Sequence, residues 1–99
     1  MKLEERVYKK LMEVPSGMVV TYGELARAVG LKNGQRKIGQ IMRTNPFPVI
    51  IPCHRVVRSD GNIGGYAFGI ERKVSMLYEE GIEISNGKIV EFKDRLFYF

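Results

Sequence analysis

The sequence predicts a mainly α domain of the α+β class, a winged-helix-like helix-turn-helix domain with a small hairpin, formed by residues 1–99 as a single domain. Two observations predict this fold. Apolar residues recur at helical spacing in four segments, and an Asn-Gly pair near the C-terminus is a strong hairpin signal. The chain is long enough to bury a core without disulfides or a metal ion, and 44% of its residues are hydrophobic.

The first two helices have clear sequence signals at their ends. One helix is predicted over residues 3–13, where apolar side chains follow at helical spacing until Pro15 and Gly17 interrupt them. A second is predicted over Tyr22–Val29, with Thr21 as its N-cap because a threonine hydroxyl can accept a bond from the first turn.

A third helix follows the second after a short turn that begins at Gly30. It is predicted over Gln35–Arg43 and must end before Pro46, because the residue before a proline is driven out of the helical region. Its outer face is basic. Two short helices joined by a glycine turn, the second with a basic face, are typical of a helix-turn-helix.

The C-terminal part is predicted as a helix, a hairpin and a packed end. The helix covers Glu71–Glu80 and ends at Gly81. Residues 82–92 alternate weakly around the Asn86-Gly87 turn, which predicts the hairpin. The aromatic end, residues 96–99, is expected to pack against the domain, since it would otherwise be an exposed apolar tail.

Positive charge is concentrated in the middle of the chain. The net charge is +5, and the stretch from Thr21 to Arg58 alone holds seven positive side chains against one acid, a net of +6. Five of the seven are arginines, which suit phosphate and base contacts better than lysines do. The distribution indicates a polyanionic partner, and nucleic acid is the common one.

Cys53 is the single cysteine, and it stands beside His54 in the apolar run of residues 50–57. The reactive thiolate forms near positive charge or near a base, and His54, Arg55 and Arg58 supply both. A buried, inert thiol is the alternative. One cysteine and one histidine fall short of a usual zinc site, so we expect no metal and no cofactor.

A glycine-rich loop over residues 59–69 follows the cysteine segment. Glycine lets backbone approach a ligand closely. Tyr66 and Phe68 interrupt the loop, where they could form the wall of a pocket for a base or fill the core.

Together these residues resemble the C-terminal, active domain of the DNA alkyltransferases that repair guanine alkylated at O6. The resemblance covers about residues 3–81. It rests on Tyr22, Arg36, Asn45-Pro46, Pro52–Val56, Gly65-Tyr66 and Glu80-Gly81. Each residue alone has an ordinary structural explanation, as a core aromatic, a solvated charge or a helix end. The joint, collinear spacing is what makes the match specific.

The resemblance implies a catalytic role for five residues. Cys53 would attack the alkyl carbon, activated by His54 through a water molecule, and Glu80 would orient the imidazole. Tyr22 would donate a proton to the departing guanine. Asn45 would hold the turn between the recognition helix and the active-site segment. The thioether has no easy route back, so each molecule would act once.

The resemblance also implies that the damaged guanine is flipped out of double-stranded DNA, and that Arg36 fills the gap it leaves. The implied DNA-binding residues are Thr21, Arg36, Lys37, Gly39, Gln40 and Arg43. The implied lesion pocket is lined by Met42, Val56, Tyr66 and Ala67.

The implied function is direct repair of O6-alkylguanine in DNA by irreversible alkyl transfer to Cys53, by a protein that acts as a monomer. The alternative comes from the short chain and from its C-terminal tail, which look more like the compact alkyltransferase-like proteins. Those bind alkylated guanine without repairing it, hand it to excision-repair proteins, and usually carry tryptophan at the position of Cys53. A third class, a small cysteine hydrolase, leaves the basic helix unexplained, and turnover of a small ester would reveal it.

Two further expectations concern the rest of the chain and its location. The N-terminal domain that usually precedes this module is absent from the sequence. Residues 1–6 lack the apolar core of a signal peptide, and no stretch approaches a membrane span. We therefore expect a cytoplasmic, DNA-associated protein without membrane contact, whose thiol stays reduced.

Overall fold

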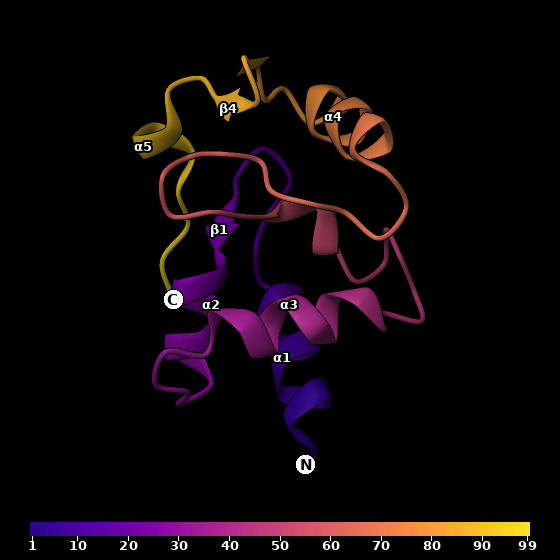
Figure 1. Ribbon diagram of the computed structural model, residues 1–99, viewed down its shortest axis with the longest axis vertical. Helices are drawn as coiled ribbons and strands as arrows, with labels where there is room; N and C mark the ends of the chain where they lie inside the picture. The colour runs from indigo at the N-terminus through magenta and orange to yellow at the C-terminus, as the bar shows by residue number, and fades with distance from the viewer.

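Five α-helices, one 3-10 turn and four two-residue strands make up the computed structural model, which describes all of residues 1–99 (Figure 1). The helices are α1 (Leu3–Leu11), α2 (Tyr22–Ala28), α3 (Gln35–Arg43), α4 (Ile70–Glu79) and α5 (Phe92–Arg95), and the 3-10 turn is η1 (Cys53–Arg55). The strands are β1 (Val20–Thr21), β2 (Val56–Val57), β3 (Ile84–Ser85) and β4 (Lys88–Ile89). None of the helices combines the length and the apolar character needed to cross a membrane.

The predicted helices are confirmed, with small differences at their ends. Helix α1 stops at Leu11, two residues earlier than expected, because the chain tightens there: the N–H of Val14 donates to the carbonyl of Leu11. Thr21 caps α2 as predicted, and its hydroxyl accepts from the N–H of Glu24 at 3.0 Å. Such a cap stabilises a helix by about 1 kcal/mol.

The buried side chains form two cores that meet at β1 and β2. Helices α1, α2 and α3 enclose a helical core of 13 buried residues, and a smaller core of six lies under α4 and the hairpin. Neighbouring residues of a strand point to opposite sides. Accordingly Val56 belongs to the helical core and Val57 to the smaller one, and Val20 of β1 and Val19 directly before it are divided in the same way.

A parallel pairing of β1 with β2 was not predicted from the sequence. Val20 pairs with Val56 and Thr21 with Val57. Helix α2, and with it Tyr22, begins where β1 ends, and η1 with Cys53 directly precedes β2. The pairing therefore places the start of the helix-turn-helix next to the cysteine segment.

The hairpin is confirmed, but it is shorter than predicted. Strands β3 and β4 pair antiparallel around Asn86 and Gly87, whose φ values of 52° and 77° fit the two positions of a tight hairpin turn. The strand does not continue to Phe92, because Glu91 adopts a left-handed conformation and α5 begins after it.

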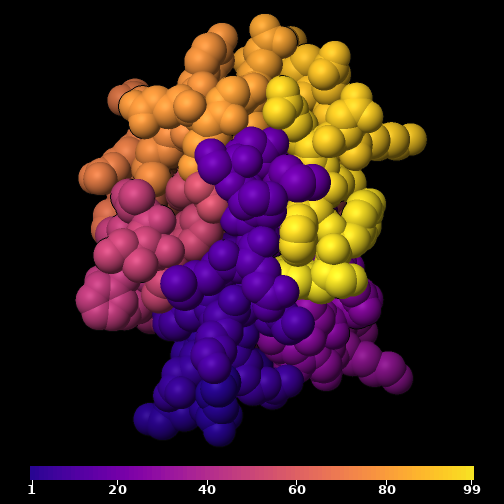
Figure 2. Space-filling view, turned by 180° about the vertical axis from the view of Figure 1, so that it is seen from behind, coloured from indigo at the N-terminus to yellow at the C-terminus, as the bar shows by residue number.

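The C-terminal residues pack along the N-terminal part of the chain, with one exception. Val19 bridges to Leu96, and Figure 2 shows the yellow C-terminal segment running beside the indigo N-terminal one. Phe97 and Phe99 pack against the helical core as expected. Tyr98 was expected to pack too, but it points outward and is 68% exposed, because alternate residues of an extended segment face opposite sides.

Candidate active site and DNA-binding surface

Asn45 holds the loop that leads from α3 to Cys53. Its side-chain N–H donates to the carbonyl of Ile51 at 2.9 Å and to the sulfur of Cys53 at 3.2 Å, and its oxygen accepts from the N–H of Phe47 at 2.9 Å. Within this loop Val49 has a φ of 77°, a strained value for a β-branched residue. The contacts of Asn45 therefore fix both the strained loop and the position of the sulfur.

Behind Cys53, His54 and Arg55 converge on one carboxylate. The Nε2 atom of His54 lies 2.9 Å from Oε2 of Glu80, and Arg55 donates to both oxygens of Glu80, at 3.0 and 2.6 Å. Arg55 also donates to the carbonyl of Val14 at 2.8 Å. Burial would raise the pKa of Glu80, but the bonds from Arg55 and His54 outweigh it and lower that pKa. Glu80 is thus a carboxylate at neutral pH.

The protonation of His54 follows from these contacts. Burial lowers the pKa of His54, and the bond to Glu80 only partly opposes this effect, so the imidazole is neutral at pH 7. Since a carboxylate can only accept, the proton of the neutral ring is on Nε2. The other nitrogen, Nδ1, is a buried acceptor without a partner in the protein. It is the atom of this group that can take up a proton.

Lys73 was not identified from the sequence. Its side chain is fully buried on α4, and Nζ donates to the carbonyl of Val56 at 2.7 Å and to that of Gly65 at 3.0 Å. Burial lowers the pKa of Lys73 to about 8, although the nearby Cys53 acts to raise that pKa. A sequence signal existed, because Lys73 falls on the stripe of α4 that its apolar residues mark as buried.

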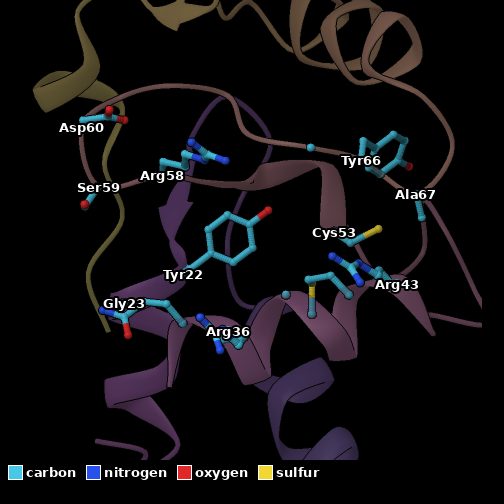
Figure 3. Close-up of a pocket in the computed structure, with 14 residues that line it drawn as sticks. Tyr22, Gly23, Arg36, Arg43, Cys53, Arg58, Ser59, Asp60, Tyr66 and Ala67 are labelled. Atoms are coloured by element: carbon cyan, nitrogen blue, oxygen red, sulfur yellow. The ribbon is translucent and has the colours of Figure 1, made fainter. Parts of the chain in front are cut away.

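A cavity of about 1030 Å³ opens in front of Cys53 (Figure 3). Eight of the predicted site residues line it: Tyr22, Arg36, Gly39, Met42, Arg43, Cys53, Tyr66 and Ala67. They come from the start of α2, from α3, from η1 and from the glycine-rich loop. The structure thus brings the thiol, the tyrosine and the basic face of α3 to one cavity.

Other predicted residues lie elsewhere. Val56, predicted for the lesion pocket, is fully buried in the helical core and is not among the residues that line the cavity. Thr21 is occupied as the cap of α2. Lys37 and Gln40 are exposed on α3 outside the cavity. Phe68 does not line the cavity either, but its ring stands edge-on to the lining Tyr66 with centroids 5.4 Å apart.

Six lining residues were not predicted as site residues: Gly23, Gln35, Arg58, Ser59, Asp60 and Gly65. Three of them, Arg58, Ser59 and Asp60, form one wall of the cavity. No local sequence pattern predicts this wall, because its position depends on the fold of the loop after β2. Arg58 had been predicted as part of the basic segment and as a positive charge near Cys53, but not as a residue of the cavity. Gly23, Gln35 and Gly65 are each adjacent in the sequence to a predicted site residue, and this adjacency was the available signal for them.

The two tyrosines of the cavity keep their protons at neutral pH. Burial raises the pKa of Tyr22, although Arg58 and Arg43 oppose it. Burial and the proximity of Cys53 raise the pKa of Tyr66 to about 12, and its hydroxyl donates to the sulfur of Met76. Both side chains are therefore hydrogen donors rather than bases.

The fold and this site define a helix-turn-helix domain whose single cysteine lines a cavity and is followed by a histidine in contact with a glutamate. By sequence, residues 2–82 match the family described as 6-O-methylguanine DNA methyltransferase, DNA binding domain, and the chain belongs to this family. The predicted family and the predicted fold class are thereby confirmed.

Curated relatives agree with this assignment over part of their length. A methylated-DNA–protein-cysteine methyltransferase of Thermococcus kodakarensis is 47% identical over 81 residues, covering 81% of this chain and 45% of that protein. A bifunctional methyltransferase/endonuclease of Picrophilus torridus is 45% identical over 83 residues, covering 84% of this chain and 28% of that protein. The chain thus spans less than half of the length of these relatives.

Two solved structures show the likeness in three dimensions. S. pombe Atl1, in complex with damaged DNA containing O6-carboxymethylguanine, has a TM-score of 0.86 at 32% identity, and each chain covers 100% of the other. Mycobacterium tuberculosis OGT, in complex with DNA, has a TM-score of 0.79 at 37% identity, covering 82% of this chain and 49% of that one. The tail beyond residue 82 therefore has its counterpart in Atl1.

Proposed function

We propose that this protein binds O6-alkylguanine in double-stranded DNA and repairs it by transferring the alkyl group to Cys53. The observation that carries the proposal is the placement of the thiol. Cys53 lines the cavity, receives the amide N–H of Asn45 at 3.2 Å, and stands next to a neutral His54. An N–H aimed at sulfur stabilises negative charge on it, and a neutral imidazole can accept the thiol proton.

The proposed transfer is a nucleophilic displacement at the alkyl carbon, and each proton that moves has a donor and an acceptor. The thiol proton leaves through a water molecule to Nδ1 of His54, and Glu80 stabilises the imidazolium that results. The sulfur of Cys53 forms a bond to the alkyl carbon while the bond from that carbon to O6 breaks. Tyr22 gives its proton to the leaving guanine, which departs more easily as a neutral base. The tyrosinate regains its proton from the imidazolium or from solvent.

Access to the thiol requires that the base leaves the duplex. Cys53 is only 4% exposed, so a guanine stacked in DNA cannot reach it and must be flipped into the cavity. Helix α3 contributes Arg36 and Arg43 to the lining of the cavity. In the proposed complex both side chains face the DNA, and Arg36 fills the gap in the stack.

Binding without transfer is a second candidate function, and the full-length likeness to Atl1 favours it. Proteins of that compact type bind alkylated guanine, as the sequence resemblance implies, and the match with Atl1 includes the tail. The comparisons support this reading better than they support catalysis. The chemistry of Cys53 favours transfer, because a thiol is a good attacking group and a poor stacking surface.

Intact-protein mass spectrometry after mixing with an O6-methylguanine duplex distinguishes alkyl transfer from binding without transfer. Transfer adds one methyl group to the protein and returns one guanine for each. Cys53→Ser should then bind the duplex without a gain in mass, because a neutral hydroxyl is a far weaker nucleophile. A stable complex with both masses unchanged after long incubation would establish binding without transfer.

Arg36→Ala should weaken binding of a lesion in duplex DNA more than it weakens binding of the same lesion in single-stranded DNA. The reason is that a single strand leaves no gap in a base stack to be filled. Titrations of both substrates by fluorescence anisotropy measure the difference. Lys37→Ala, from the exposed face of the same helix, serves as the comparison and should weaken both alike. Equal losses for Arg36→Ala would reduce it to an ordinary phosphate contact.

A further inference from the structure

We infer that Arg58 forms an anion subsite of the cavity, which binds a backbone phosphate of the flipped nucleotide. The inference rests on the proposed binding of flipped alkylguanine, because only a nucleotide rotated out of the duplex carries its phosphates to this wall. It applies whether or not transfer to Cys53 follows.

The arginines of the chain fall into two groups. Four of the eight donate hydrogen bonds to acceptors within the protein: Arg6, Arg27, Arg55 and Arg95. The other four make no such bond and no ion pair: Arg36, Arg43, Arg58 and Arg72. Three of these four line the cavity, and only Arg72 does not. The guanidinium groups left without a protein partner are therefore concentrated where a ligand binds.

Arg58 approaches the cavity from the side opposite to α3. In Figure 3 Arg58 lies above the Tyr22 ring, on the side of the loop that follows β2, while Arg36 lies on α3 below that ring. The backbone of Arg58 is fixed, since its N–H donates to the carbonyl of Asn62 at 2.9 Å and its carbonyl accepts from Gly61 at 3.0 Å. The cavity thus has cations on two walls, as a nucleotide with a phosphate on each side requires.

Gly64 holds the side chain of Arg58 close to Tyr22. A Cβ atom on Gly64 would lie 3.5 Å from the hydroxyl of Tyr22 and 3.6 Å from Cγ of Arg58, so both side chains pack over this glycine. Its φ of +72° also favours glycine. The side chains of Tyr22 and Arg58 therefore both pack against Gly64.

The one acid on this wall does not neutralise Arg58. Asp60 accepts from the N–H of Asn62 at 2.9 Å, and no ion pair joins it to Arg58. With Arg36 and Arg43 the lining keeps a net charge of +2. A guanidinium binds a phosphate through two parallel N–H donors, which fixes its orientation as well as its distance.

A phosphate fits this position better than an acidic group on the lesion itself. The alkyl carbon must face Cys53 to react or to fill the pocket. In Figure 3 Arg58 lies above the ring of Tyr22, whereas Cys53 lies to the right of that ring, near Tyr66 and Ala67. A substituent on O6 that points to the sulfur therefore points away from the guanidinium.

The test is a coupling experiment between the protein and single phosphates of the DNA. Arg58→Met removes the charge from an exposed side chain, and Arg72→Met is the matched control from an exposed arginine outside the cavity. Binding is measured to O6-methylguanine duplexes in which one phosphate beside the lesion at a time is a neutral methylphosphonate. We expect Arg58→Met to weaken binding to the unmodified lesion duplex about tenfold or more, and Arg72→Met to leave it nearly unchanged.

One neutral phosphate should weaken binding by the wild type and cause no further loss in Arg58→Met, because both changes remove the same contact. Losses that add at every phosphate would overturn the assignment of Arg58. So would a loss confined to O6-carboxymethylguanine, which would place the anion on the lesion. A wild type that binds lesion and undamaged duplex alike would refute the proposed function and this subsite together, whereas a clear lesion preference without coupling refutes the subsite alone.

Discussion

Replacing Glu80 with alanine should lower the free energy of unfolding by about 3 kcal/mol, because it leaves a buried imidazole and a guanidinium without their shared carboxylate. His54 is 1% exposed, and Arg55 and Glu80 are mostly buried as side chains. For a domain of this size the loss corresponds to a fall in Tm of roughly 10 to 20 °C. Thermal unfolding followed by circular dichroism measures it.

Two comparisons make this result specific to the network. Glu79→Ala removes the neighbouring acid, which is exposed and forms no ion pair, and should change Tm little. Glu80→Gln keeps the shape and one acceptor oxygen, so it should fall between the wild type and the alanine variant. A Tm of Glu80→Ala within a few degrees of that of Glu79→Ala would contradict the structural role assigned to the carboxylate.

Lys73→Met should remove a rise in stability that the wild type shows between about pH 8 and pH 10.5. The pKa of Lys73 is about 8 in the folded protein and 10.5 in a solvated chain. Between these values the unfolded state holds the proton that the folded state has released, so raising the pH favours the folded state. The difference in pKa corresponds to about 3 kcal/mol.

Urea unfolding at pH 7, 8, 9 and 10 measures the effect as the difference between wild type and variant. Tyrosines also titrate at high pH, but they do so in both proteins and cancel in the difference. Lys93→Met, at an exposed position, should follow the wild type. A difference between wild type and Lys73→Met that stays constant from pH 7 to 10 would contradict the lowered pKa.

How much of this site the sequence predicts depends on whether the signal is local. Helices are set by periodicity and by caps, so the Thr21 cap and the extent of α3 could be predicted closely. The candidate site around Cys53 was predicted from a collinear set of residue types that resembles a known family. The contacts that join segments distant in the sequence have no local sequence signal. Two-residue strands 36 positions apart carry no pattern of their own, and their pairing turned Val56 from the expected pocket wall into the core.

The burial of Lys73 is a second feature that depends on tertiary contacts and that the sequence did not predict. The apolar stripe of α4 marks position 73 as buried, but the charge of a lysine is costly to bury, so the residue type indicates the surface instead. Lys73 is nevertheless fully buried, since two carbonyl groups from separate segments meet its ammonium group. Those carbonyl groups belong to Val56 and Gly65, and only the tertiary fold brings them together.

The two rungs that join β1 to β2 also decide how the site moves. Tyr22 directly follows β1 and Cys53 lies three residues before β2, so the strand pairing connects the two side chains through very short stretches of backbone. In the proposed complex with DNA, a movement of the helix-turn-helix should therefore displace Tyr22 and Cys53 together and change the distance between them little. The amide protons of this ladder should accordingly be among the slowest to exchange with solvent. If the proposed function holds, the protein keeps this part of its site rigid, and the change of shape on binding occurs in the DNA.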